Sequence, residues 1–163
     1  MTKKKSKYVS KEEGLAKLQK YCAYQDRCHQ EVRNKLLELG IYGDDLEEII
    51  SDLIGENFLN EERFARSYAR GKFRIKRWGK LRIQQELKKR KISAYCLKKA
   101  MQELDEEDYE GILRVLVDKR RAQEKEKNEY KKKIKIAQHL IRRGFESHLV
   151  WGILNEAHSR KSR

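Results

Sequence analysis

Apolar residues recur every three or four positions along most of this chain, which is the spacing of one buried face of an α-helix. Ser10 and Glu13 form a capping-box pattern, which predicts the start of a helix. Gly40 follows an apolar run and is typical of the position just after a helix C-terminus. Three helices are therefore predicted in the first third, at about residues 10–24, 28–39 and from 44 onward.

The same apolar pattern returns twice further along the chain. Its first copy consists of Val32, Leu36, Ile41, Leu46, Ile49, Ile50 and Leu53. The equivalent residues 51 positions later are Ile83, Leu87, Ile92, Leu97, Ala100, Met101 and Leu104. Those 104 positions after the first copy are Ile136, Leu140, Phe145, Val150, Ile153, Leu154 and Ala157. A repeat of about 50 residues that keeps every apolar position predicts three tandem three-helix units.

This repeat sets the expected architecture. We expect an all-α protein in which the units stack at right angles into an elongated, curved array, because one unit of this size buries little surface alone. The expected segments are a disordered basic tail at 1–9, units at 10–57, 58–104 and 105–158, and a frayed end at 159–163.

Two features interrupt the repeat. Gly40 recurs as Gly144, but Lys91 occupies the equivalent position of the middle unit, which leaves room for a different turn there. The segment from Asp118 to Lys133 has almost no apolar residues. Its mixed charge fits both an exposed helical extension and a flexible linker.

Composition supports a helical protein and locates its charge. The chain has no proline, 40% of its residues are charged, and its formal net charge is +14. Residues 1–57 carry a net charge of −1, residues 58–104 of +11 and residues 105–163 of +4. Most of the positive excess therefore belongs to the middle unit.

The opening helix of the middle unit carries arginines on one side. Asn60 is a typical N-cap for this helix. Phe64, Tyr68 and Ile75 lie within about 40° of each other around the helix axis and are predicted to be buried. Nearly opposite lie Arg63, Arg66, Arg70, Arg74 and Arg77.

Most of these arginines lack an acidic neighbour at helical spacing. Glu62 can pair with Arg66, but no Asp or Glu lies three or four positions from Arg70, Arg74 or Arg77 within the helix. Such a face is compatible with a solvated surface that only keeps the protein soluble. Because stacked like charges destabilise a helix, we favour a surface that binds a polyanion, either nucleic acid phosphates or an acidic protein groove.

Several functional classes lack their sequence signals. No run approaches the ~20 apolar residues of a membrane span, and the basic start is not followed by an apolar segment, so a cytoplasmic location is expected. The three cysteines lack C-x-x-C spacing, which fits a reducing compartment. Because Gly-rich phosphate loops and the H-E-x-x-H and G-x-S-x-G motifs do not occur, we predict no enzyme, no cofactor and no metal site.

The two tryptophans have two possible roles. Tryptophan can stack on nucleic acid bases, but it more often packs between helices. Trp151 lies in an apolar run and is predicted to pack, whereas Trp78 fits both roles equally.

The central segment resembles the signature of the RecX regulatory proteins of bacteria. Their pattern is approximately Leu-Asn-Asp-Glu-Arg-Phe-Ala, a spacer, and Gly-x-x-Arg-Ile-x-x-Glu-Leu. The residues that match its first half are Leu59, Asn60, Glu62, Arg63, Phe64 and Ala65. Those that match its second half are Gly79, Arg82, Ile83, Glu86 and Leu87. Residues 31–41 and 139–145 are similar to the family's first and third repeats, so the resemblance covers roughly residues 10–157.

The resemblance implies a modulator of the RecA recombinase that acts in recombination, DNA repair and the SOS response. Members of this family bind the RecA–DNA filament, lie in its helical groove, and restrain filament growth, strand exchange, ATPase and co-protease activity. From the net charge we expect sequence-independent binding to single-stranded and double-stranded DNA, and we expect a monomer. The residues expected to contact filament or DNA are Arg66, Arg70, Arg74, Arg77, Lys80, Arg82, Lys88, Lys89, Arg142 and Arg143.

A free-standing, non-specific DNA-binding protein of helical repeats is the alternative. The second and third helices of each unit resemble a helix-turn-helix. However, the third helices carry LEEIISDL, LKKAMQEL and LVWGILNEA, which lack the row of Arg, Asn and Gln that reads bases in a groove. A footprint on a defined DNA site would favour this alternative.

Overall fold

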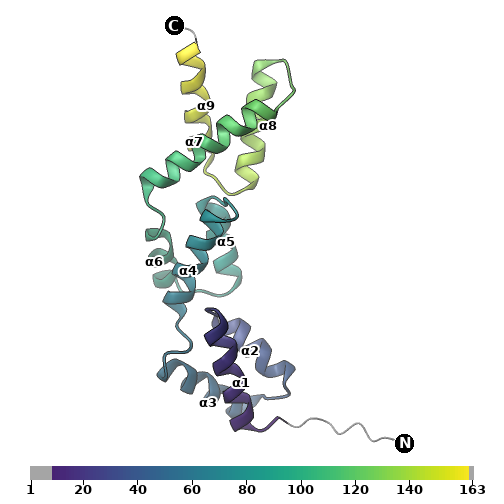
Figure 1. Ribbon diagram of the computed structural model, residues 1–163, viewed down its shortest axis with the longest axis vertical. Coiled ribbons are helices and arrows are strands. Elements are labelled where there is room, and N and C mark those ends of the chain that lie inside the picture. The colour runs from purple at the N-terminus through teal and green to yellow at the C-terminus, as the bar shows by residue number, and fades with distance from the viewer. Residues whose placement is uncertain (1–8, 162–163) are drawn as a thin grey trace, which may run out of the picture.

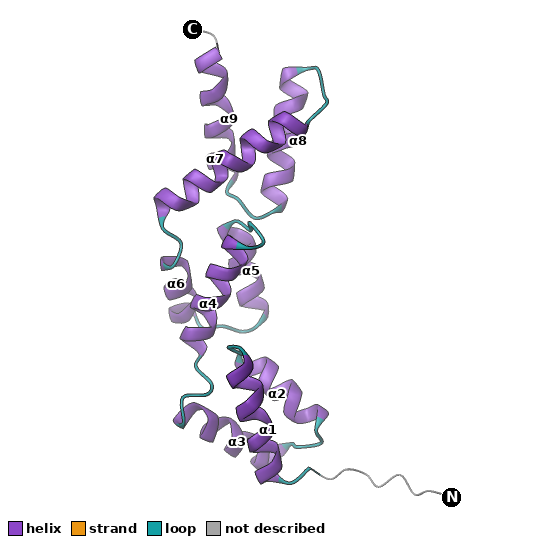
Figure 2. Cartoon of the chain, in the orientation of Figure 1, coloured by secondary structure: helices purple, strands orange, loops and turns teal. Residues whose placement is uncertain are grey.

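The computed structural model describes residues 9–161, and from residue 157 onward only the course of the backbone. Within this range the chain forms nine helices joined by loops, and it forms no strand (Figure 2). The helices are α1 (Lys11–Tyr24), α2 (His29–Glu38), α3 (Gly43–Gly55), α4 (Glu61–Arg74), α5 (Lys80–Lys89), α6 (Ala94–Gln102), α7 (Glu106–Gln123), α8 (Glu129–Arg142) and α9 (Ser147–Lys161). The predicted all-α repeat fold is confirmed.

The molecule is elongated, with three groups of helices following one another along its long axis (Figure 1). The helices α1–α3 contact each other, as do α4–α6 and α7–α9. The expected tail at 1–9 lies outside the described residues apart from Val9. At the other end α9 continues to Lys161, so residues 159–161 of the expected frayed end are helical.

The repeated apolar positions form the cores of these groups. All seven residues of the first copy are buried. In the middle copy five are buried, and Leu97 and Met101 are half-buried. In the third copy six are buried, and the side chain of Ala157 lies outside the described part. The α1–α3 group has its own core, whereas α4–α6 and α7–α9 share a continuous one.

The turn after the second helix of each group has the same left-handed geometry. The φ angles are 79° at Gly40, 57° at Lys91 and 101° at Gly144. The possibility of a different turn at Lys91 is therefore wrong. A lysine occupies a conformation that favours glycine, because the buried positions on both sides of the turn, Leu87 and Ile92, hold the chain in it.

The buried side of α4 differs from the predicted one. Phe64 is buried as predicted, but Tyr68 is only half-buried and Ile75 is 80% exposed. Ile75 still donates the helical hydrogen bond to the Gly71 oxygen, so it is exposed because the buried face of α4 is centred elsewhere, on Ala65 and Ala69. Phe73 is buried instead, and its ring stacks on Tyr109 of α7 with centroids 5.6 Å apart. The predicted buried face is therefore wrong at Ile75 and missed Phe73.

The segment 118–133 contains both kinds of structure. Helix α7 continues to Gln123 and α8 begins at Glu129, with Asn128 as its N-cap. Asn128 accepts a hydrogen bond from the amide of Lys131 at 3.0 Å. The polar segment is thus an extension of α7, a five-residue loop at 124–128, and the start of α8.

Candidate polyanion interface

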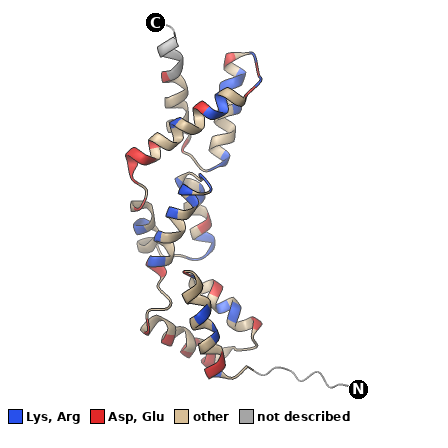
Figure 3. Cartoon of the chain, viewed as in Figure 1, with Lys and Arg blue, Asp and Glu red and all other residues tan. Residues whose placement is uncertain are grey.

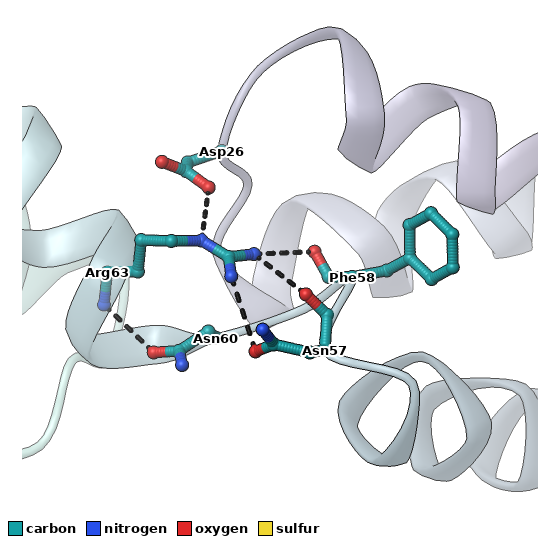
Figure 4. A network of polar contacts seen from close by, with 5 residues as sticks. All are labelled: Asp26, Asn57, Phe58, Asn60 and Arg63. Atoms are coloured by element: carbon teal, nitrogen blue, oxygen red, sulfur yellow. Dashed lines mark hydrogen bonds and ion pairs between the residues drawn. The ribbon is translucent and has the colours of Figure 1, made fainter.

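Arg63, the first arginine of the predicted face, links the first two groups of helices (Figure 4). Its Nε donates to the Asp26 carboxylate at 2.7 Å. Its Nη2 donates to the backbone oxygens of Asn57 and Phe58, both at 3.1 Å. Asn57 itself has a φ of 62°, so the chain turns sharply here after α3. Arg63 therefore holds together the joint between the first two groups of helices.

The next two arginines are neutralised by the carboxylate of Glu103, the C-cap residue of α6. Arg66 Nη1 lies 2.8 Å from Glu103 Oε1, and Arg70 Nη1 lies 3.3 Å from Glu103 Oε2. The hydrogen bond from Arg66, together with the charge of Arg70, lowers the pKa of Glu103 below its ordinary value. The predicted pairing of Glu62 with Arg66 is also present, with 3.8 Å between Arg66 Nε and Glu62 Oε2. Arg70 has no acidic neighbour within its own helix, as the spacing indicated, but its interpretation as an unpaired charge is wrong because Glu103 pairs with it from outside the helix.

Within the described residues, the last two arginines of the stripe have no acidic partner. Arg74 is exposed and forms no ion pair within the described part of the chain. Arg77 lies outside α4, in a turn where its φ is 57°, so it does not continue the helical stripe.

Among the described residues, the other predicted contact residues of the middle group either contact an acidic or aromatic side chain or are exposed without an ion pair. Lys89 is paired with Glu86 at 3.1 Å. Lys80 places its Nζ 4.6 Å from the ring centre of Tyr109, and Arg82 places its Cζ 4.1 Å from that of Trp78. Exposed basic side chains of the middle group that form no ion pair within the described residues are here called the free cations: Arg74, Lys76, Lys88, Lys91 and Lys98.

These cations have a clear place in the fold. Lys and Arg are frequent on α4, α5, α6 and the turns between them and also occur on α1, α2 and α8, whereas Asp and Glu mark α3 and the first turn of α7 (Figure 3). Trp78, beside the basic turn, is half-buried and packs against the shared core. Its ring is covered by Arg82 and approached by Lys72 at 4.9 Å, so packing is its observed role. Trp151 also packs against that core, as predicted.

A second basic cluster lies where the middle and last groups meet. Arg143 donates from Nε to the backbone oxygen of Arg77 at 3.2 Å and from Nη2 to that of Lys76. Arg120 Nη2 donates to His139 Nδ1 at 2.5 Å. Because a guanidinium can only donate, the proton of the neutral imidazole lies on Nε2.

The pKa values of Arg143 and His139 are both lowered, by burial and by neighbouring positive charges. Burial lowers the pKa of Arg143, and the charges of Arg82 and Arg120 lower it further. Burial also lowers the pKa of His139, assisted by Arg120, Arg143 and Arg142. Among the described residues, the charged neighbours that perturb the pKa values of these two groups are all cations. Arg120 was missed by the sequence analysis because it lies in a mixed-charge run and approaches the other arginines only through folding.

Comparison with known proteins shows which family shares this architecture. The RecX second three-helix domain matches residues 60–101, and the RecX third three-helix domain matches residues 106–154. The chain belongs to the RecX family. The matched segments correspond to α4–α6 and α7–α9, the groups that share one core and carry both basic clusters.

Relatives of this family extend the match over most of the chain. The chain is 27% identical to Regulatory protein RecX of Prosthecochloris aestuarii over 136 residues, which are 83% of this chain and 87% of the relative. It is 25% identical to Regulatory protein RecX of Bacillus cytotoxicus over 141 residues, which are 86% of this chain. The chain spans about half the length of that relative, 52%. The crystal structure of RecX from Lactobacillus salivarius has a TM-score of 0.81 and 27% identity, and it matches 90% of this chain and 95% of its own.

These names mark RecX as a family of regulatory proteins. No helix in the described part of the chain is long and apolar enough to cross a membrane.

The three cysteines are buried and free, and burial raises the pKa of Cys28 to about 11.

Proposed function

We propose that this protein regulates a RecA-type recombinase in the cytoplasm by binding along the recombinase–DNA filament and restraining its activity. Membership of the RecX family carries this proposal. The elongated shape also supports it, because three groups of helices in a row can reach several neighbouring subunits of a polymer (Figure 1). The free cations supply the electrostatic part of the contact, since repeated phosphates attract unpaired Lys and Arg.

Co-sedimentation with RecA–single-stranded DNA filaments, compared with DNA alone across a salt titration, tests this function. We expect the chain to pellet with filaments at salt concentrations that release it from DNA alone. Equal binding to DNA with and without the recombinase would favour the free-standing DNA-binding protein.

The residue assignment has its own test. The variant Arg74→Gln/Lys76→Gln/Lys88→Gln removes three free cations, and Lys17→Gln/Lys20→Gln/Lys125→Gln removes three exposed charges elsewhere. The first variant should bind filaments more weakly, and each lost phosphate contact should flatten the slope of log K against log salt by about 0.7–0.9. Equal weakening by both variants would mean that only net charge matters, and unchanged binding by the first would remove the assignment.

A further inference from the structure

The junction between the middle and last groups of helices brings together arginines that are distant in the sequence. Arg82 belongs to α5, Arg120 to α7 and Arg142 to the end of α8, and Arg143 follows directly. Gly144 brings these segments together, because a Cβ built on it would lie 2.4 Å from the Cβ of Arg82. Two backbone hydrogen bonds add to the contact, from the amide of Gly79 to the Arg143 oxygen and from that of Leu81 to the Gly144 oxygen.

The arginines of this junction are held but not neutralised. Backbone oxygens of Lys76 and Arg77 hold Arg143 through Nε and Nη2, and its Nη1 keeps no hydrogen-bond partner among the described residues. Arg82 lies against Trp78, and Arg120 against His139. Within the same described range, no Asp or Glu forms an ion pair with Arg82, Arg120, Arg142 or Arg143. Three of these four side chains are half-buried, so water screens their repulsion less than it would on an open surface.

A multiply charged anion would relieve this repulsion. Guanidinium groups bind phosphate oxygens through planar, charge-assisted hydrogen bonds, and several of them together can bind several phosphate oxygens at once. The rigid placement of Arg143 and Arg82 means that little side-chain entropy is lost on binding. The free cations are exposed, and no hydrogen bond or ring contact holds their side chains within the described residues, so they lack this preorganisation.

We propose that Arg82, Arg120, Arg142 and Arg143 form a discrete binding site for a chain of phosphate groups that together carry several negative charges. The chain is either consecutive phosphodiesters of a nucleic acid strand, each with one charge, or the phosphates of a free nucleotide or polyphosphate. For the first source, the inference rests on the proposed function and names where the filament's DNA is held. Bound phosphate bridges the middle and last groups of helices and sits beside the His139 imidazole.

The test uses the full chain without recombinase, so it is independent of filament regulation. The variant Arg82→Gln/Arg120→Gln/Arg142→Gln is compared with Lys17→Gln/Lys20→Gln/Lys125→Gln, which removes the same charge elsewhere. Arg143 is left unchanged because it holds the Lys76–Arg77 turn. Calorimetry with inorganic tripolyphosphate and with a dT oligonucleotide measures affinity, and NMR of the His139 imidazole reports on the site.

In the wild type, tripolyphosphate should raise the pKa of His139 and stabilise the fold against heat. The junction variant should lose about tenfold or more in affinity, while the control variant keeps the affinity within a factor of about three. Loss for both probes identifies nucleic acid as a source, and loss for tripolyphosphate alone identifies a free polyphosphate. Equal affinities of the two variants for both probes, or a His139 signal that neither probe moves, would overturn the proposal.

Discussion

Gly79 and Gly144 touch through their backbones, so that a Cβ built on Gly79 would lie 2.2 Å from the carbonyl carbon of Gly144. This contact lets the carbonyls at the end of α8 accept hydrogen bonds from the first amides of α5, at 2.8 Å and 3.0 Å. Each helix end thereby satisfies backbone groups that the other leaves unpaired.

A side chain added at Gly79 should force the middle and last groups of helices apart. Gly79 has an ordinary φ of −78°, so Gly79→Ala tests the close approach alone. We expect a loss of about 2–4 kcal/mol in unfolding free energy, measured by urea denaturation. Gly111→Ala is the control, because a Cβ there meets nothing within 4 Å. It should be neutral or stabilising by up to about 1 kcal/mol. Similar stabilities for the two variants would contradict the tight junction.

Lys91 holds a left-handed conformation that a glycine would adopt without strain. Lys91→Gly should stabilise the protein by about 1 kcal/mol, because a side chain at a φ of 57° crowds its own backbone. Thermal and urea unfolding check this expectation. Lys91→Ala separates the backbone effect from loss of the charge and should leave stability nearly unchanged. Stabilisation by alanine as large as that by glycine would assign the effect to the charge.

The joint between the first two groups depends on Arg63. A double-mutant cycle with Arg63→Met and Asp26→Asn should give a coupling energy of about 0.5–1 kcal/mol, because this ion pair is partly exposed. Arg63→Met should destabilise more than Asp26→Asn, since Arg63 also donates to the Asn57 and Phe58 oxygens. Arg74→Met is the control and should change stability little, because Arg74 is exposed and has no ion pair among the residues that the structure describes. A coupling of zero would mean that the hydrogen bonds from Arg63 to Asn57 and Phe58 hold the joint without Asp26.

Glu103 masks two cations of the predicted binding face. Glu103→Gln should release Arg66 and Arg70 and strengthen binding to a dT oligonucleotide. The salt slope should steepen by up to about 0.7–0.9 for each new phosphate contact. Glu107→Gln changes the net charge equally at an exposed residue that forms no ion pair within the described part of the chain. Fluorescence anisotropy across salt concentrations compares the two, and an equal gain in both would show that Glu103 masks nothing.

Tyr109 lies at the junction between the middle and last groups of helices, and its hydroxyl has two hydrogen-bond partners. It accepts from the Lys80 amide at 3.0 Å and donates to the Glu146 carboxylate. Tyr109→Phe leaves both groups without this partner and should destabilise the protein by about 1–3 kcal/mol at neutral pH. Urea unfolding at neutral pH measures this difference.

The Tyr109 hydroxyl also predicts how stability depends on pH. Burial, followed by the bond to Glu146, raises the pKa of Tyr109 well above its ordinary value of about 10. Its contribution is therefore complete below about pH 10 and lost as pH rises further, because the unfolded chain ionises first. Thermal unfolding of wild type and Tyr109→Phe should show their difference shrinking above pH 10. A difference that stays constant to pH 11.5 would contradict the raised pKa.

The sequence by itself determined the helices, their order and the repeated cores. Capping at Ser10 and Asn60 and the spacing of apolar residues are local properties, because a helix places residues three and four positions apart on one side whatever surrounds it. The concentration of charge in the middle unit is likewise a property of composition.

Only the tertiary structure decided which basic side chains are paired within the protein and which remain free to bind an anionic partner. Glu103 lies 37 positions from Arg66, and Arg143 lies 66 positions from Arg77, so no helical spacing reveals these partners. The left-handed turn at Lys91 and the gathering of Arg82, Arg120, Arg142 and Arg143 arise in the same way. Electrostatic pairing depends on distance through space, and that distance is set when helices from different parts of the chain pack together.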